Sequence, residues 1–552
     1  MSSMLRLSCQ QKSVLRIPAG LVRIGSIRYY SGKSNSSNSS KGKEKPGNGT
    51  VILVSTISAT TVGISALTFF QQDSKDPQKV GKEQKYATRT VMEAAVLEIK
   101  RGLGEDSVST EDEILCAHGY SDWSTCNIDR LPVAVAFPKS TEEVSQIAKI
   151  CFAKNVPMIP YSGGSSVEGH FSAPFGGVSI DFSNMNQIVK LHGEDMNIEV
   201  QPSVSWMEMN EKIKHTGLFF PIDPGPSAQI GGMIGTNCSG TNAVRFGTMK
   251  DWVVNLTVVL ADGTILKTRR RPRKSSAGYN LNSLIVGSEG TLGFVTEATL
   301  KLATIPEENG VAVVTFPNIK EAASMAAEVV QQSIPVGAVE ILDDVLMRVI
   351  NKMGASSRKW GETPTLFFKF SGTSTSVADN IKQVKKIADK YETFEFLYES
   401  DPVKQKTLWS ARKEALWSML ALRETEGHVW STDVAVPLSR VAELIELSKK
   451  DLDGLGLFGS ILGHIGDGNF HETILYEDKD REKVERCVHK MIHRALEMEG
   501  TCTGEHGIGM GKKEFLREEV GDAPIEVMRA IKTSLDPKWL MNPGKIFDRY
   551  DR

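Results

Sequence analysis

A glycine-rich run at residues 227–241 constrains this chain more than any other feature of its sequence. Its letters, SAQIGGMIGTNCSGT, combine glycine with serine, threonine and small apolar residues. Glycine loses more conformational freedom on folding than other residues, so a loop with a purely structural role would rarely be this rich in it. The run is typical of a backbone that lies close to an extended ligand, with a structural loop as the alternative.

Two further glycine clusters flank this run in the sequence. Residues 161–166 (YSGGSS) follow a predicted strand, and backbone N–H groups in such a turn can hold a pyrophosphate, although turns of this composition are common. Residues 287–293 (GSEGTLG) precede another predicted strand. No cluster reads G-x-G-x-x-G between a strand and a helix, so the NAD-binding fingerprint is absent. A P-loop around Lys512 is excluded as well, because that motif requires glycine where the chain has His506.

The charge balance excludes one broad class of function. The 552 residues include 65 Lys+Arg and 67 Asp+Glu, which gives a net charge of −2. There is no basic excess to neutralise phosphates, so we expect no nucleic-acid partner. At roughly 150 residues per domain, the length predicts about three folded units.

The N-terminal residues have the composition of a targeting signal. The first acidic residue is Glu44, and the residues before it are rich in arginine, lysine and serine. An acid-free leader of this kind is typical of a mitochondrial transit peptide, with a disordered basic tail as the alternative. We therefore predict a transit peptide and polar linker over residues 1–50.

Residues 51–70 contain no charged residue and no proline. At ~1.5 Å per residue a helix of this length reaches ~30 Å, the thickness of a bilayer core. We predict a single anchor in the lipid of the mitochondrial inner membrane, with a buried helix as the alternative. Lys41, Lys43 and Lys45 flank its N-terminal side. If they stay in the matrix, the catalytic body faces the intermembrane space.

The remaining sequence predicts alternating helices and strands. After a linker and N-terminal helical segment (71–114), a strand–helix–strand pattern begins near residue 133, and a hairpin follows at residues 256–267. Residues 306–430 contain few glycine motifs and predict a second α+β domain. The predicted helices are 91–100, 141–153, 320–332 and 376–391, and the predicted strands are 133–137, 156–160, 178–180, 198–200, 256–260, 264–267, 311–316 and 365–370.

Three histidines lie in glycine-rich contexts. His464 and His471 flank a turn, and Glu505 and His506 lie between two glycines. Two imidazoles and a carboxylate can bind one divalent ion and leave room for a substrate, and His506 would then be free to act as a base. The alternative is that these histidines only cap turns.

Two other features of the sequence could also carry polar chemistry. His489 and His493 are four residues apart on a charged helix, without a metal-binding pattern around them, and we interpret them as solvated surface. Arg412 lies on a predicted helix between Trp409 and Trp417. It is either a buried clamp for a carboxylate or a solvated helix arginine, and the residues leave both open.

Taken together, these segments resemble the FAD-linked 2-hydroxyacid dehydrogenases of the vanillyl-alcohol-oxidase flavin fold. The resemblance covers about residues 115–550. The motifs that carry it are 160–170 (PYSGGSSVEGH), 230–240, 287–297, 463–471 (GHIGDGNFH), 504–507 (GEHG) and 542–545 (NPGK).

The resemblance implies an α+β fold. It consists of a PCMH-type FAD-binding domain of two subdomains (115–305), an α+β cap domain that holds the substrate (306–520), and a C-terminal segment that returns to the FAD domain (521–552). It also implies His464, His471 and Glu505 as ligands of a divalent metal, Zn or Mn. The implied catalytic residues are His506 as base, Arg412 on the substrate carboxylate, and Asn469.

Relatives with covalent flavin carry a histidine in the first glycine loop, where this chain has Ser165 and Ser166, so we expect noncovalent FAD. The resemblance implies that the FAD lies against residues of the three clusters and of the C-terminal segment. These residues are Tyr161, Ser162, Gly163, Gly164, Ser165, Ser166, Pro224, Gly231, Gly232, Gly235, Thr236, Ser239, Gly240, Thr241, Gly290, Val295 and Asn542.

With its leader and anchor, the chain is similar to mitochondrial members of the family that oxidise D-lactate to pyruvate and reduce cytochrome c. A hydride would pass from C2 of the substrate to flavin N5. Members that oxidise D-2-hydroxyglutarate are the alternative, but they carry a lysine where this chain has Ser431, which favours a small monocarboxylate. A non-catalytic scaffold is the alternative from another class, and the complete histidine set argues against it.

Overall fold

The computed structural model describes residues 85–550 except 122, 355, 425 and 426. The predicted transit peptide (1–50) and the predicted anchor (51–70) lie outside these residues. Among the helices that are described, none combines the length and the apolar character needed to cross a membrane.

The first sheet begins the FAD-binding half of the chain. Its four strands have the order β1-β2-β4-β3, and β4 pairs in parallel with both β2 and β3. Helix α4 (Thr141–Lys154) connects β2 to β3 as the strand–helix–strand pattern predicts, and Ser140 caps it by accepting a hydrogen bond from the backbone of Glu143. The strands are β1 (Val108–Ser109), β2 (Ala134–Ala136), β3 (Met158–Tyr161) and β4 (Val178–Asp181), and the helices before α4 are α2 (Arg89–Leu103) and α3 (Asp112–Ala117).

A second, antiparallel sheet of five strands follows, in the order β5-β6-β10-β8-β9. The predicted hairpin is present in it, since Val259 of β8 pairs with Ile265 of β9. The strands are β5 (Ile188–His192), β6 (Asn197–Val200), β8 (Val253–Val259), β9 (Ile265–Lys267) and β10 (Phe294–Lys301), and β7 (Leu218–Phe219) pairs separately with β11 (Ala303–Thr304). The helices of this region are α5 (Trp206–Ile213), α6 (Ile230–Thr236), α7 (Ala243–Phe246), α8 (Met249–Trp252) and α9 (Leu281–Ile285).

The rest of the chain is organised around one sheet of eight strands. Its order is β15-β12-β14-β13-β18-β19-β16, and β17 also pairs with β19. The strands are β12 (Glu308–Thr315), β13 (Ala338–Leu342), β14 (Thr365–Gly372), β15 (Glu395–Glu399), β16 (His428–Ser431), β17 (Val434–Ala435), β18 (Phe458–Gly463) and β19 (Asn469–Tyr476). The strands with the histidine motif thus belong to the same sheet as the predicted strands at 311–316 and 365–370, which the sequence did not indicate.

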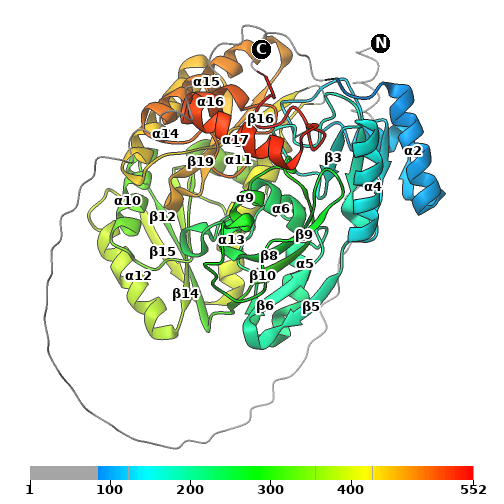
Figure 1. Ribbon diagram of the computed structural model, residues 1–552. Coiled ribbons are helices and arrows are strands. Elements are labelled where there is room, and N and C mark those ends of the chain that lie inside the picture. Colours follow the sequence, from blue (N-terminus) through cyan, green and yellow to red (C-terminus); the bar gives the residue numbers. More distant parts are fainter. Residues whose placement is uncertain (1–84, 122, 355, 425–426, 551–552) are drawn as a thin grey trace, which may run out of the picture. The chain divides into compact units, whose positions relative to one another are not determined.

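The two faces of this sheet pack against different helices, which Figure 1 labels. One face packs against α10 (Ile319–Gln331), α12 (Ser374–Ala388), α14 (Leu438–Leu455) and α15 (Arg481–Glu497). The other packs against α11 (Asp344–Met353) and α13 (Pro402–Leu420). Side chains alternate between the faces, so Phe470 and Ile474 of β19 enter the first core, while His471 points to the opposite face.

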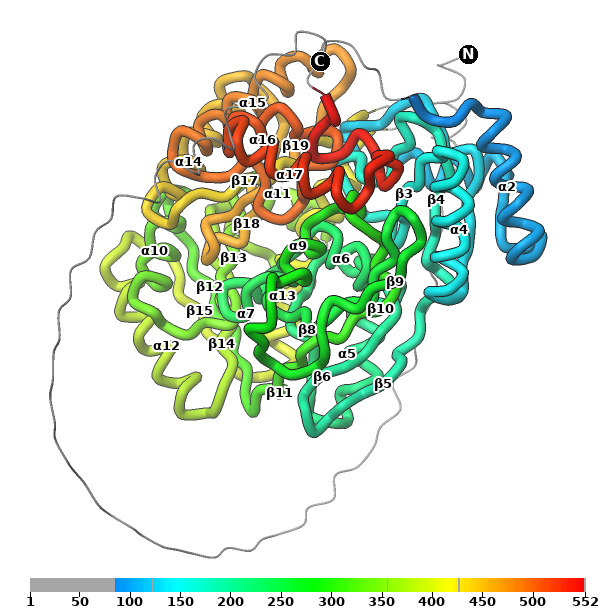
Figure 2. Tube along the Cα trace, in the orientation of Figure 1, coloured from blue at the N-terminus to red at the C-terminus, as the bar shows by residue number. Residues whose placement is uncertain are grey.

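The C-terminal segment returns to the first sheet. Helices α16 (Lys513–Val520) and α17 (Asp522–Leu535) precede an extended stretch in which Met541 forms a parallel bridge with Met158 of β3. Leu540 and Met541 are buried in the core of the N-terminal sheet. Figure 2 shows this red end of the tube beside the cyan strands. Residues more than 370 positions apart therefore meet near the first glycine cluster.

Candidate active site

His464 and His471 converge on Glu505. The Nε2 atoms of the two histidines lie 3.2 Å and 3.4 Å from the same carboxylate oxygen, Oε1. His464 follows β18 and His471 lies on β19, so the short connection between two paired strands brings the rings to one end of the hairpin. Both histidines are 6% exposed. One ligand atom from each of the three residues fits within a 4.8 Å span, and this is the one such group in the described part of the chain.

The second nitrogen of each ring is held by the protein. His464 Nδ1 lies 2.8 Å from Glu340 Oε1, and His471 Nδ1 lies 2.9 Å from the backbone oxygen of Thr432. Such contacts fix the orientation of a metal-binding histidine and leave the other nitrogen for the ion. Two imidazole nitrogens and one carboxylate, all oriented in this way, fit a divalent metal with an open coordination position.

The electrostatics of the cluster are dominated by its carboxylates. Burial would lower the pKa of His464, yet Glu340 and Glu505 outweigh this effect and raise its pKa well above the usual value. Burial would raise the pKa of Glu505, but His464 and His471 hold it well below the usual value. The site therefore favours positive charge between these two carboxylates.

His506 is stacked on His471, with ring centroids 5.0 Å apart and planes at 14°. Burial lowers the pKa of His506 to about 4, and Asp433 opposes part of this shift. The ring is therefore neutral near pH 7. Its Nδ1 atom is buried and has no hydrogen-bond partner among the described residues, so it is available to accept a proton.

Asp433 holds the loop that carries Glu505 and His506. Its Oδ2 atom accepts hydrogen bonds from the backbone N–H groups of both residues, each at 2.9 Å, and from the hydroxyl of Thr503 at 2.7 Å. Its Oδ1 atom accepts one at 2.8 Å from the side chain of Asn469, which leaves Asn469 Oδ1 buried without a partner. Sequence reasoning missed the role of Asp433, because nothing in one chain predicts which carboxylate lies under a loop some seventy residues away.

Arg412 belongs to the same cluster. Its Nε atom donates a 2.7 Å hydrogen bond to Glu340 Oε2, on a carboxylate that is 0% exposed and also contacts His464. This excludes the solvated alternative for Arg412. Its two Nη groups have no partner among the described residues and can therefore bind a carboxylate in the forked geometry of a guanidinium. Glu340 was not predicted either, since it comes from a strand of ordinary appearance.

The three glycine clusters converge in space. Ser162 donates a 2.9 Å hydrogen bond to Gln229, and the backbone of Glu289 donates one at 2.8 Å to the oxygen of Gly235. Cβ atoms added at Gly232 or Gly235 would meet nothing closer than 4.0 Å, so the backbone of α6 faces open space there. Backbone exposed in this way, next to serine hydroxyls, fits a long polar cofactor such as FAD.

Several of the predicted cofactor residues make contacts within the protein. Ser239 donates a 2.7 Å hydrogen bond to Glu505 Oε2 and so connects the glycine run to the candidate metal ligands. Thr241 donates one at 2.6 Å to Asp223. The amide of Asn542 donates to the backbone oxygens of His170 and Glu289, and the Asn542 side chain is buried there as a brace between two clusters.

The remaining predicted residues lie around the same clusters. A Cβ at Gly290 would meet Pro160 at 2.3 Å, and one at Gly163 would meet the oxygen of Ser227 at 2.6 Å, so both glycines allow close packing between clusters. The ring of Tyr161 packs against Phe171, and Val295 lies on β10. Ser165 is exposed, and Gly164, Pro224 and Thr236, the last residue of α6, are partly exposed. Gly240 is buried, and Gly231 packs against Pro202.

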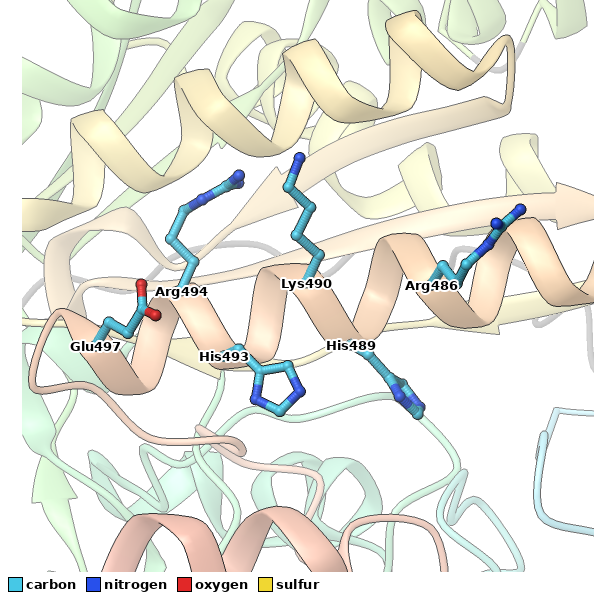
Figure 3. A pocket seen from close by; sticks show the side chains of 6 residues that line it. All are labelled: Arg486, His489, Lys490, His493, Arg494 and Glu497. Carbon is cyan, nitrogen blue, oxygen red and sulfur yellow. The ribbon is translucent and has the colours of Figure 1, made fainter.

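His489 and His493 form no comparable cluster. Their side chains are 43% and 49% exposed on α15, and each faces a glutamate of α16, with His493 Nδ1 2.9 Å from Glu518. Figure 3 shows both rings pointing away from Lys490 and Arg494, which bind Asp451. The interpretation of this pair as solvated surface is confirmed.

Comparison with known proteins gives the family. Residues 132–269 match the model of the "FAD binding domain", and residues 305–546 match that of "FAD linked oxidases, C-terminal domain". The chain is 46% identical to a mitochondrial D-lactate dehydrogenase [cytochrome] of Kluyveromyces lactis, over 84% of this chain and 82% of that protein. It is 45% identical to the protein of the same name in Arabidopsis thaliana, over 86% and 84%. The chain belongs to the family of FAD-linked oxidases. It is an FAD-dependent oxidoreductase, as the resemblance in its sequence implies.

A more distant member of the FAD-linked oxidase family and a solved structure are consistent with this assignment. D-2-hydroxyglutarate dehydrogenase of Stutzerimonas stutzeri is 30% identical over 82% of this chain and 99% of that protein. The structure of p-cresol methylhydroxylase with bound substrate superimposes with a TM-score of 0.68 at 17% identity, over 84% of this chain and 99% of that one. The latter likeness concerns the fold, and it confirms the predicted α+β architecture of the PCMH type.

Proposed function

We propose that this FAD-linked oxidase oxidises D-lactate to pyruvate in mitochondria and passes the electrons to cytochrome c. The names of its relatives at 45–46% identity support the substrate, the acceptor and the compartment. We further propose that residues 1–50 direct the chain to mitochondria, and that residues 51–70 anchor it in the inner membrane with the body in the intermembrane space.

One observation in the structure carries the proposal. A continuous set of short contacts leads from Arg412 through Glu340 and His464 to Glu505, with distances of 2.7, 2.8 and 3.2 Å. His471 contacts the same Glu505 oxygen, and His506 is stacked on His471. A group that binds a carboxylate and a group that accepts a proton therefore belong to one cluster. A 2-hydroxy acid presents a carboxylate and a hydroxyl on adjacent carbons, which these two groups match.

The residues of the chain have distinct roles in this proposal. The free Nη groups of Arg412 bind the substrate carboxylate and orient the molecule. His506, neutral near pH 7, accepts the proton of the substrate hydroxyl. The set of His464, His471 and Glu505 would hold a divalent metal, Zn or Mn, whose Lewis acidity would favour loss of that proton. Bound FAD supplies the acceptor for the hydride that leaves C2, and this completes the two-electron oxidation to the keto acid.

The position of Ser431 supports a monocarboxylate. Ser431 lies on β16 opposite Thr473 of β19, two residues before Asp433. Where dehydrogenases of D-2-hydroxyglutarate are expected to have a lysine, this chain presents an uncharged hydroxyl. A second carboxylate therefore lacks a cationic partner at this position, and its desolvation would not be compensated.

Anaerobic reduction of the flavin tests the proposal. The full-length protein is mixed with D-lactate, L-lactate or D-2-hydroxyglutarate, and the loss of the oxidised flavin absorbance is followed, then its return on adding oxidised cytochrome c. We expect bleaching by D-lactate alone among the three and recovery with cytochrome c. Bleaching only by the dicarboxylate would overturn the argument from Ser431. Bleaching without recovery would exclude cytochrome c as the acceptor.

A further inference from the structure

The loop at residues 503–509 is held at both ends by buried carboxylates. Asp433, which lies between β16 and β17, binds the first half, as described above. The second half is bound by Glu289, which belongs to the glycine cluster at 287–293 in the FAD-binding half of the chain. Glu289 Oε1 accepts a 2.7 Å hydrogen bond from the backbone of Ile508, and Oε2 accepts one at 2.8 Å from Gly509.

Glu289 is itself tightly constrained. It is 6% exposed, and its φ of 53° lies in the left-handed region that residues other than glycine rarely adopt. Asn542 fixes the Glu289 carbonyl through a 2.8 Å hydrogen bond. Burial would raise the pKa of the Glu289 carboxyl, but His170 and the two backbone N–H groups hold it below the usual value. A strained backbone and a buried charge at one residue indicate that its position matters for a neighbour.

The loop has no room to take another path past this carboxylate. A Cβ at Gly507 would lie 2.8 Å from both Glu289 Oε1 and His170 Nε2, and a Cβ at Gly509 would lie 2.0 Å from the backbone oxygen of Glu168. Both glycines also have positive φ, of 82° and 50°. The backbone two residues after Glu505 is thus pressed against the Glu289 carboxylate.

His170 extends the arrangement to the first glycine cluster. Its Nε2 atom lies 3.0 Å from Glu289 Oε2, and its Nδ1 atom is hydrogen-bonded to the hydroxyl of Ser166. Contacts therefore run without interruption from Ser166, through His170 and Glu289, to the loop that carries Glu505 and His506. Neither His170 nor Glu289 contacts the metal-binding or proton-accepting atoms.

We propose that Glu289 is a positioning residue that, together with His170, sets the loop 503–509 against the first glycine cluster and so aligns His506 and Glu505 with the cofactor. This inference rests on the proposed function for its catalytic consequence. Its structural part, that Glu289 holds the loop, stands independently. In the cluster at 287–293, the glutamate then positions the loop of the active site, in addition to the role of the glycines beside the cofactor.

The test replaces one carboxylate oxygen by an amide. In Glu289→Gln the side chain keeps its size but can accept only one of the two backbone hydrogen bonds and loses its charge next to His170. Asp343→Asn is the matched control, because the Asp343 carboxylate is also fully buried, accepts a backbone hydrogen bond from Leu346 at 2.8 Å and lies 3.3 Å from Lys449, yet is not hydrogen-bonded to this loop.

Two readouts are compared in the FAD-loaded, full-length variants. The first is amide hydrogen exchange of a peptide covering residues 503–510, which we expect to rise by roughly tenfold or more in Glu289→Gln and to stay unchanged in the control. The second is the rate of flavin reduction by D-lactate, which we expect to fall by roughly 10–100-fold at saturating substrate, with little change in the half-saturating concentration, because misalignment affects the reacting geometry more than binding.

Each result decides the inference. Unchanged exchange in Glu289→Gln, or an equal rise in Asp343→Asn, would overturn it. A flavin of the unmodified protein that no 2-hydroxy acid reduces would refute the proposed function, while the exchange comparison would still test the hold on the loop. If Glu289→Gln does not fold, His170→Gln removes the imidazole that contacts both Glu289 and Ser166 while leaving the Glu289 carboxylate in place. It should show the same pattern at a smaller size, and unchanged exchange and flavin reduction in this variant would refute the inference.

Discussion

Two pairs of histidines in this protein differ in almost everything except residue type. His464 and His471 are 6% exposed and share one carboxylate oxygen at 3.2–3.4 Å. The side chains of His489 and His493 are 43% and 49% exposed, and each contacts a separate glutamate of α16. The comparison teaches that spacing in sequence does not make a site. Burial and shared partners do.

The physical reason lies in the elements that carry the pairs. The buried pair lies at one end of two paired strands and faces a loop that brings a carboxylate and a third ring. The exposed pair lies on one side of a helix, and its contacts with glutamates of α16 are open to solvent, where ion pairs are screened and contribute little. In the buried site, by contrast, the charges of Glu340 and Glu505 act over short distances with little solvent between.

The largest effect should come from removing a shared ligand. We expect His471→Ala to abolish metal binding and to slow flavin reduction by D-lactate by at least ~1,000-fold, since both proton loss and substrate orientation depend on the site. His493→Ala should retain both within about twofold. Metal content and single-turnover rates, measured on both variants, check this. Equal losses in the two variants would remove the distinction between the pairs.

A chelator should remove the metal while the FAD stays bound. Among the described residues, Ser239 provides the one hydrogen bond between the candidate ligands and the three glycine clusters. A chelator should therefore stop turnover and leave the FAD absorbance in the protein. The measurement is the activity and the flavin content after gel filtration, followed by restoration with Zn or Mn. Full activity in a preparation without detectable metal would refute the metal site.

His506→Ala should retain FAD and metal but slow flavin reduction by roughly 100–10,000-fold, the range expected for a general base. The variant distinguishes the residue stacked on the site from those that hold the ion. Single-turnover rates with D-lactate, together with metal content, provide the measurement. An unchanged rate would exclude His506 as the base.

Arg412→Lys should act mainly on binding. Lysine keeps the charge next to Glu340 but loses the planar fork, so we expect the half-saturating concentration of D-lactate to rise by roughly 10–100-fold with a smaller change in maximal rate. Arg486→Lys, on the exposed side of α15, is the matched control and should leave both unchanged. If the role of Arg412 were purely structural, Arg412→Lys would instead lower the thermal stability and leave the half-saturating concentration of D-lactate unchanged.

The smallest expected effect is the change in the free energy of unfolding when one histidine of the exposed pair is replaced. His493→Ala removes an exposed contact with Glu518 and should change the free energy of unfolding by about 0.5 kcal/mol or less. Thermal or urea unfolding of the variant checks this. A loss of several kcal/mol would show that the pair on α15 supports the fold, contrary to its exposure.

The sequence alone determined the family, the α+β architecture and the identity of the histidines, because local patterns carry these properties. Glycine density, strand and helix periodicity, and the short motifs around His464 and Glu505 can each be recognised within a short stretch of sequence. The hairpin at 256–267 and the helix at 141–153 followed from turn and capping residues in the same way.

Only the tertiary structure decided which residues hold the site together. Asp433 binds the loop of Glu505 from some seventy positions away, Glu289 binds its other end from more than two hundred, and Glu340 joins Arg412 to His464. A buried carboxylate has no local signature, because what makes it functional is the set of donors that folding brings to it. The motifs predicted the candidate catalytic residues, and the positions of these residues relative to one another depend on contacts between distant parts of the chain.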